Sequence, residues 1–169
     1  GPAMSEELAF GAHIPSGELQ NEYLSFWADR QLFAVPIREV RQIIRMQKIV
    51  EVPDYPPYAR GIINLRGDII PIIDVRMRLG KPEIPYNDRT CIIIIDVGGH
   101  QYGIVVDQVS EVMEITKQQF SQPPQIGGVS VNEYLNGIAK IENKVVMALD
   151  CSKLLREKEY QALVSAAEA

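Results

Sequence analysis

One segment of this chain occurs twice, and that repeat limits what the chain can fold into. Residues 61–79 align without a gap with residues 137–155, at a constant offset of 76 positions. Each copy runs from a glycine through two β-branched stretches to an aspartate, Asp74 in the first copy and Asp150 in the second. Chance similarity between strands rich in isoleucine and valine is the alternative, but the matching glycines and aspartates favour a duplication.

A second match lies upstream of the first. Residues 33–43 correspond to residues 102–112 at an offset of 69, and the strands before them correspond as well. The offset grows by 7 between the two matches, which indicates an insertion within residues 117–134. Because a period of this length is too long for a solenoid, we expect two small β subdomains built from diverged copies of one unit.

The local pattern of the repeat predicts a strand, a turn, a second strand and a short helix. Isoleucines flank a turn signal at Gly67-Asp68, as is typical of a hairpin. Asp74 is placed to cap a short helix, and Asp150 to cap a final helix that continues to about Ala167. The second hairpin is expected to turn near Asn143. Residues 92–95 are four isoleucines, which predicts a strand buried on both faces.

The connecting segments give weaker signals. Residues 36–44 begin with proline and carry apolar side chains at helical spacing, which predicts a short amphipathic helix. Residues 48–52 are expected to form a short strand. The prolines of residues 53–58 predict a stiff connector, and residues 117–136 a long irregular loop.

These elements predict a mainly β fold of two small barrels, because closing a sheet removes its exposed edges. We expect no signal peptide and no membrane-spanning segment. We expect a tag scar and flexible tail in residues 1–21, followed by a first β-barrel subdomain in residues 22–86 and a second in residues 87–150. Residues 151–169 are expected to form a C-terminal helix that packs back on the first subdomain.

Composition excludes some classes of partner. The net charge of −5 and the pI of about 5.1 argue against nucleic acid, which requires a dense basic surface. Two arginine clusters, residues 38–45 and residues 76–78, are interpreted as solvated faces. The two cysteines, Cys91 and Cys151, have no metal or redox spacing and are expected to be buried, reduced thiols.

The sequence carries no recognisable catalytic set. The two histidines, His13 and His100, have no nucleophile or metal partner nearby in the sequence. Asp74 and Asp150 are explained as helix caps, and Arg66-Gly67-Asp68 as a turn rather than an adhesion motif. We therefore expect a binding module that is not an enzyme and has no metal and no cofactor.

Three segments carry a resemblance to a known family. NLRGDIIPIIDVR (residues 64–76), YND.T (residues 86–90) and GIVVDQVSEV (residues 103–112) resemble the CheW family of bacterial chemotaxis coupling proteins, over about residues 22–165. The resemblance implies two five-stranded SH3-like barrels and a scaffold that joins chemoreceptor cytoplasmic tips to the regulatory domain of the histidine kinase CheA. It further implies a cytoplasmic protein at membrane-associated receptor arrays, with ring assembly alongside kinase regulatory domains.

The resemblance also implies a receptor-binding groove between the barrels. Many members carry an acidic residue where this chain has Gln42, so the resemblance supplies no internal acidic partner for Arg66 at that position. The kinase-binding residues are not assigned. A coupling protein of a non-flagellar receptor–kinase pathway is the alternative function, and an enzyme is a distant one. The matching groove positions are Val40, Gly61, Arg66, Gly103, Val109 and Val112.

Overall fold

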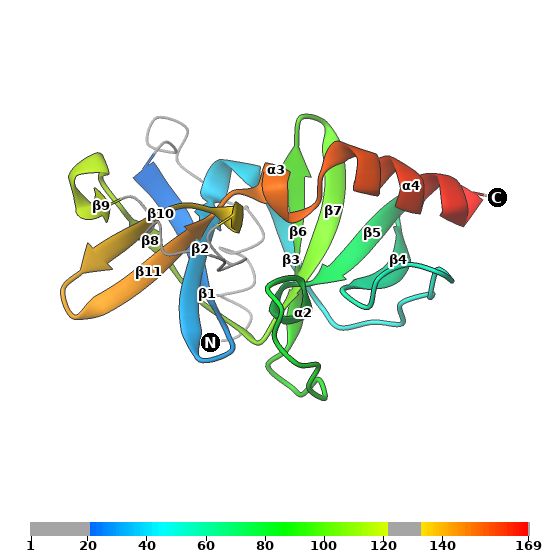
Figure 1. Ribbon diagram of the computed structural model, residues 1–169, viewed down its shortest axis with the longest axis horizontal. Coiled ribbons are helices and arrows are strands. Elements are labelled where there is room, and N and C mark those ends of the chain that lie inside the picture. The colour runs from blue at the N-terminus through cyan, green and yellow to red at the C-terminus, as the bar shows by residue number, and fades with distance from the viewer. Residues whose placement is uncertain (1–20, 122–132, 169) are drawn as a thin grey trace.

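The computed structural model describes residues 21–121 and 133–168, which form two β-sheets side by side with short helices between and beside them (Figure 1). The expected N-terminal tail and part of the expected long loop lie outside the described residues. One sheet, sheet A, has the order β8-β1-β2-β11-β10-β9. Its strands are β1 (Glu22–Ala28), β2 (Gln31–Pro36), β8 (Gln108–Glu114), β9 (Phe120–Ser121), β10 (Leu135–Ile141) and β11 (Lys144–Leu149).

The other sheet, sheet B, has the order β3-β6-β7-β5-β4. Its strands are β3 (Val40–Arg45), β4 (Ala59–Leu65), β5 (Asp68–Asp74), β6 (Cys91–Val97) and β7 (His100–Val106). The helical elements are short except for the last, α4. They are η2 (Ile37–Glu39), α2 (Val75–Arg78), η3 (Lys117–Gln119), α3 (Cys151–Leu154) and α4 (Glu157–Glu168).

The strand registers confirm the duplication. Ile72 pairs with Gly103 between the parallel strands β5 and β7, and Ala148 pairs with Ala34 between β11 and β2. These two pairs correspond at offsets of 76 and 69, the offsets found in the sequence. The β-bulges correspond too: β4 is bulged before Gly61 and β10 at the matching place. Five strands of sheet A therefore follow the same order as the five strands of sheet B, and β9 is an addition.

The boundary expected at residue 86 does not separate the sheets. The first repeat unit gives β1 and β2 to sheet A but β3, β4 and β5 to sheet B. The second unit gives β6 and β7 to sheet B and its remaining strands to sheet A. The chain therefore crosses between the sheets after β2 and again after β7. The divisions 22–86 and 87–150 describe repeat units, and each sheet combines strands of both.

Three apolar clusters follow from the alternation of side chains along the strands. In β6, Ile92 and Ile94 belong to a cluster to which all five strands of sheet B contribute, so this sheet curls around its own interior. Ile93 and Ile95 belong to a larger cluster shared by both sheets. A third cluster fills the interior of sheet A. The isoleucine run is thus buried on both faces, as predicted.

Two expected elements are wrong in detail. Residues 36–44 form η2 and the start of β3 instead of a helix. A bulge in β3 lets Val40 and Ile43 both face the shared cluster. Their separation of three residues is also the spacing of one helix face, which explains the wrong prediction. Residues 48–52 make one isolated bridge, from Val50 to Ile62. The second hairpin turns at residues 142–143, as expected, and its left-handed residue is Glu142, with φ of 55°.

The final helix is broken into α3 and α4. Leu155 is extended at the break, and the Arg156 N–H donates to Oε1 of Glu159 at 2.9 Å. α4 packs on β4 and β5, mainly through the buried Leu163. Arg78 of α2 holds this corner, because it donates to the Leu154 carbonyl at 2.7 Å and to Glu159 at 2.8 Å.

A second arginine of α2 connects the two sheets. Arg76 donates to Asp29 at 3.0 Å and to Asp107 at 2.6 Å. Asp29 lies in the β1–β2 turn of sheet A, and Asp107 lies where the chain passes from β7 to β8. The Arg76 side chain is only 12% exposed. Arg76 and Arg78 are therefore internal ion-pair residues, contrary to the solvated face expected from the sequence.

Candidate protein-binding site

The most open apolar residue among the expected groove positions is on β8, the edge strand of sheet A. Val109 pairs with Phe26 and Val112 pairs with Leu24, so both valines lie on the side of the strand that faces the cluster shared by the two sheets. Val109 is half-buried against that cluster, and Val112 is 43% exposed. An exposed valine beside a continuous apolar cluster is the kind of contact that a partner's apolar helix can cover.

Val40 is the counterpart of Val109 in the other sheet. Val40 pairs with Ile95 just as Val109 pairs with Phe26, and these two pairs are equivalent in the duplication. The burial differs, because Val40 is 4% exposed and belongs to the shared cluster. Val40 is therefore a core residue, and the two halves of the expected groove are unequal.

The two glycines of the expected groove are packing residues. A Cβ on Gly61, whose φ is 138°, would lie 2.0 Å from the Val50 carbonyl oxygen. A Cβ on Gly103 would lie 2.6 Å from Cδ1 of Ile72, inside the interior cluster of sheet B. Neither glycine lines an open surface, so the expectation that they line a groove is corrected.

Arg66 lies apart from the valines, in the two-residue turn between β4 and β5. Its φ of 55° is left-handed, and the Gly67 N–H donates to the Asn64 side chain at 2.9 Å. Within residues 21–121 and 133–168, Arg66 makes no hydrogen bond or ion pair. The turn itself does not need an arginine, because its repeat counterpart is Glu142, also with φ of 55°. The guanidinium is therefore available to a partner.

The hollow beside Arg66 has a volume of about 470 Å³. Gln42 lines it, so the sequence was right to place this residue near Arg66, and no acidic side chain stands at that position. Arg41 also lines the hollow and pairs with Asp96 at 3.2 Å. No sequence pattern pointed to Arg41 and Gln101, which reach the hollow from β3 and β7. The other five expected site residues do not line it; its lining is Arg41, Gln42, Leu65, Arg66, Asp68 and Gln101.

The groups considered for catalysis have structural roles. Asp74 accepts from the Met77 N–H at 3.1 Å and from the Tyr86 hydroxyl at 2.8 Å. Asp150 accepts from the Ser152 N–H at 3.0 Å, so both aspartates cap helices as predicted. The His100 ring stacks on Tyr160 with centroids 4.6 Å apart. Among the described residues, no three His, Cys, Asp or Glu side chains are grouped to hold a metal ion.

The two cysteines are both free thiols. Cys151 is buried and Cys91 is largely covered. Burial raises the pKa of the Cys91 thiol to about 11, and burial also raises the pKa of Cys151. Thiols that remain protonated are poor nucleophiles, so these cysteines are packing residues.

Comparison with known proteins fits this arrangement of two related sheets. The family model of the CheW-like domain matches residues 22–159. This chain belongs to the CheW-like domain family. The chemotaxis protein CheW of Bacillus subtilis is 31% identical over 153 residues, covering 90% of this chain and 96% of its relative.

Two further relatives extend the comparison. The chemotaxis protein CheW of Klebsiella aerogenes is 29% identical over 162 residues, covering 96% of this chain and 98% of that protein. The crystal structure of the scaffolding protein TtCheW from Thermoanaerobacter tengcongensis superposes with a TM-score of 0.75 at 29% identity, covering 82% of this chain and 94% of that one.

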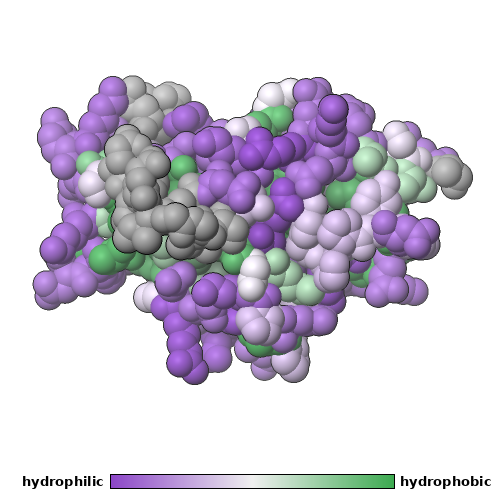
Figure 2. Space-filling model, in the orientation of Figure 1, coloured by the Kyte–Doolittle hydropathy of each residue, from purple (hydrophilic) through white to green (hydrophobic). Residues whose placement is uncertain are grey.

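The surface of this CheW-like domain is mostly polar on the face shown in Figure 2. Hydrophilic residues predominate there, and hydrophobic residues appear in smaller, separate areas. None of the helices within residues 21–121 and 133–168 is long and apolar enough to span a bilayer.

Proposed function

We propose that this CheW-like domain is a non-catalytic scaffold of chemotaxis, which couples chemoreceptor cytoplasmic tips to the histidine kinase CheA. Family membership and the names of the relatives support the scaffold role. The observation that carries it is that the exposed Val112 of edge strand β8 and Arg66, which makes no hydrogen bond or ion pair among the described residues, lie in different sheets. A scaffold needs such separate surfaces because it must hold two partners at once.

The receptor tip is proposed to bind along β8. Val112 supplies an exposed apolar contact, and Val109 continues it into the shared cluster. Receptor tips are helical, and a helix presents apolar residues along one face that such an edge can cover. The role proposed for the buried residues is indirect, because they set the packing of the strands next to this surface. These residues are Val40, Gly61 and Gly103.

The kinase regulatory domain is proposed to bind elsewhere, at a barrel end, and the complex is proposed to form rings at membrane-associated receptor arrays in the cytoplasm. The hollow with Arg66 would offer the charged contact: the resemblance implied Arg66 for the receptor groove, but Arg66 lies in sheet B, apart from Val109 and Val112 of β8. A guanidinium presents a planar fork of donors that suits a carboxylate or backbone carbonyls. No step of this role requires a cofactor or a reactive side chain.

Substitution of Val112 tests the receptor surface. Val112→Asp places a charge in the proposed contact and should weaken binding of a purified receptor-tip fragment roughly tenfold or more. The matched control is Val145→Asp, since Val145 is also an exposed strand valine of sheet A. Equal binding by both variants, with native circular dichroism, would contradict the proposal.

The same surfaces would serve a receptor–kinase pathway that does not control flagella. Purification of the complex from cells, followed by identification of the receptor, assigns the pathway.

A further inference from the structure

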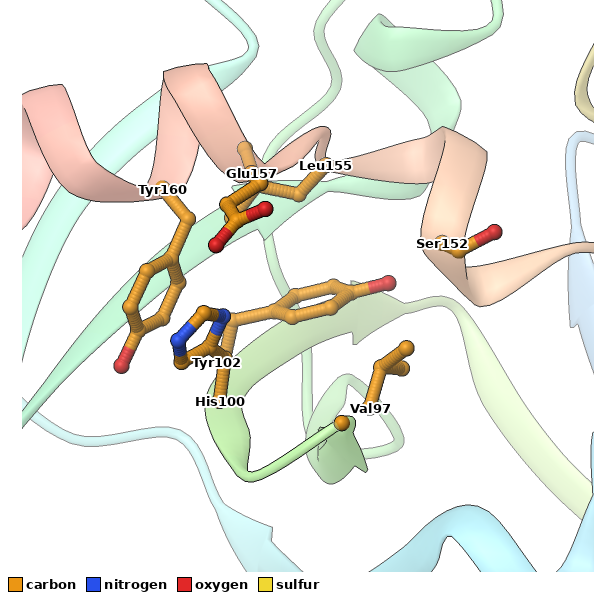
Figure 3. A pocket seen from close by; sticks show the side chains of 8 residues that line it. Val97, His100, Tyr102, Ser152, Leu155, Glu157 and Tyr160 are labelled. Atoms are coloured by element: carbon orange, nitrogen blue, oxygen red, sulfur yellow. The ribbon is translucent and has the colours of Figure 1, made fainter.

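A hollow of about 260 Å³ lies between the β6–β7 turn and the corner where α3 meets α4 (Figure 3). Val97, Leu155 and the ring of Tyr102 give it an apolar lining. The rings of His100 and Tyr160 stack at an angle of 14° and form a flat wall beside it. The Glu157 carboxylate points into the space between the Tyr160 and Tyr102 rings (Figure 3).

The negative charge of Glu157 has no positively charged side chain beside it among the described residues of this hollow. Within the described part of the chain, Glu157 makes no hydrogen bond or ion pair through its side chain, and no lysine or arginine lines the hollow. Two carboxylates, Asp96 and Asp68, also act on the Tyr160 hydroxyl, and of these Asp96 is already paired with Arg41 at 3.2 Å. A carboxylate beside aromatic rings, without a cation, is complementary to a positively charged guest.

Elsewhere in the chain, an arginine binds to a similar combination of a carboxylate and aromatic rings. The Arg78 guanidinium lies 4.1 Å from the ring centroid of Tyr58 and 5.1 Å from that of Tyr134. It donates to Glu159, which belongs to α4 as Glu157 does. One turn of this helix thus supplies one carboxylate to the internal Arg78 site and another to the hollow.

We propose that the hollow binds an arginine side chain presented by a partner protein. The aliphatic stem would lie on Val97 and Leu155, while the guanidinium pairs with Glu157 and stacks against the His100–Tyr160 wall. The volume is below the roughly 300–1,000 Å³ of ligand pockets, so it suits one side chain rather than a cofactor. This site is distinct from the surfaces of Val112 and Arg66 and does not depend on the proposed scaffold role.

Short peptides test the site directly. The ¹⁵N-labelled full chain is titrated with acetyl-Gly-Arg-Gly-amide and followed by NMR, with the citrulline peptide as a neutral control of the same shape. We expect the arginine peptide to shift the amide signals of residues 97–102 and 152–160, and the citrulline peptide to leave them in place. Equal shifts with citrulline, or no shifts in these two segments, would overturn the proposal.

Variants identify the groups responsible. Glu157→Gln keeps the shape of an exposed side chain and should weaken binding about threefold or more, as loss of an exposed ion pair does. The control is Glu114→Gln on β8, which should bind as the wild type does. Tyr160→Leu should also weaken binding, with an unchanged dispersion of the remaining signals showing that the chain is folded. Equal affinity for the corresponding lysine peptide would refute the assignment to arginine.

Discussion

Replacement of Arg76 by methionine should destabilise the protein far more than an ordinary surface arginine would. Methionine keeps much of the apolar stem but leaves Asp29 and Asp107 without their shared cation. Removing one partner of a buried ion pair costs about 3–5 kcal/mol. Here the aspartates are about a third exposed and Lys81 lies 3.4 Å from Asp29, so water and this lysine offset part of the loss. We therefore expect about 3 kcal/mol, the lower end of that range.

Thermal unfolding followed by circular dichroism measures this loss. A loss of 3 kcal/mol should lower the Tm by roughly 6 to 12 °C in a chain of this length. The matched control is Arg60→Met, because Arg60 pairs with Glu83, whose side chain is 56% exposed. That pair should contribute less than about 1 kcal/mol and be screened by salt, whereas the Arg76 effect should persist in about 1 M salt.

Similar losses in the two variants would refute the reasoning, because they would show that Arg76 contributes no more than a solvated arginine. A double variant sharpens the comparison. With Asp107→Asn already present, Arg76→Met should cost clearly less than in the wild type, since the pair is already broken. Additive losses would mean that the two side chains do not interact in solution.

Three further predictions concern α4, the glycines and the β4–β5 turn. Burial alone would raise the pKa of Glu159, but hydrogen bonds from Tyr58 and the Arg156 N–H and the charge of Arg78 hold this pKa below its usual value. The ionised Glu159 therefore stabilises the protein fully above the unfolded pKa, and this stabilisation is lost as pH falls below about 4. The free energies of unfolding of the wild type and of Glu159→Gln should converge at that acid pH, and a difference that stays constant with pH would contradict this. Gly61→Ala should cost roughly 3 kcal/mol or more in urea unfolding, against about 1 kcal/mol for Gly67→Ala, which meets no atom within 4 Å; equal costs would show that the Val50 contact is relieved. Arg66→Ala should change the Tm by no more than a few degrees and weaken the receptor–scaffold–kinase complex roughly tenfold, with Arg66→Lys recovering part of it; normal assembly by Arg66→Ala would leave Arg66 an ordinary turn residue.

The duplication was visible in the sequence because it preserves local patterns. Offsets of 69 and 76 predicted which strands are equivalent, and the pairing registers agree residue by residue. The exchange of strands between the units was not predictable in this way. The strands of one repeat unit could pair with each other or with strands of the other repeat unit. Both arrangements need the same hydrophobic alternation and the same turns. The choice depends on the crossings after β2 and β7, which no local pattern records.

The site residues show a similar limit. The pattern related Val40 to Val109 correctly, yet their burial differs because each is covered by segments far away in the sequence. The arginines of α2 were interpreted as solvated because nothing nearby pairs with them. Their partners are distant: Arg76 is 47 residues from Asp29, and Arg78 is 81 residues from Glu159. A turn arginine such as Arg66 is different, since the glycine beside it makes its exposure predictable.

Sedimentation of a three-component mixture tests whether one chain holds two partners through separate surfaces. The full chain is mixed with a receptor-tip fragment and with the regulatory domain of the kinase, and the mass of the complex is measured by analytical ultracentrifugation. We predict one species that contains all three components, with the kinase domain retained as the receptor fragment is increased. Displacement of the kinase domain by excess receptor fragment would show that the partners share one surface, and the proposal of two separate surfaces would then be wrong.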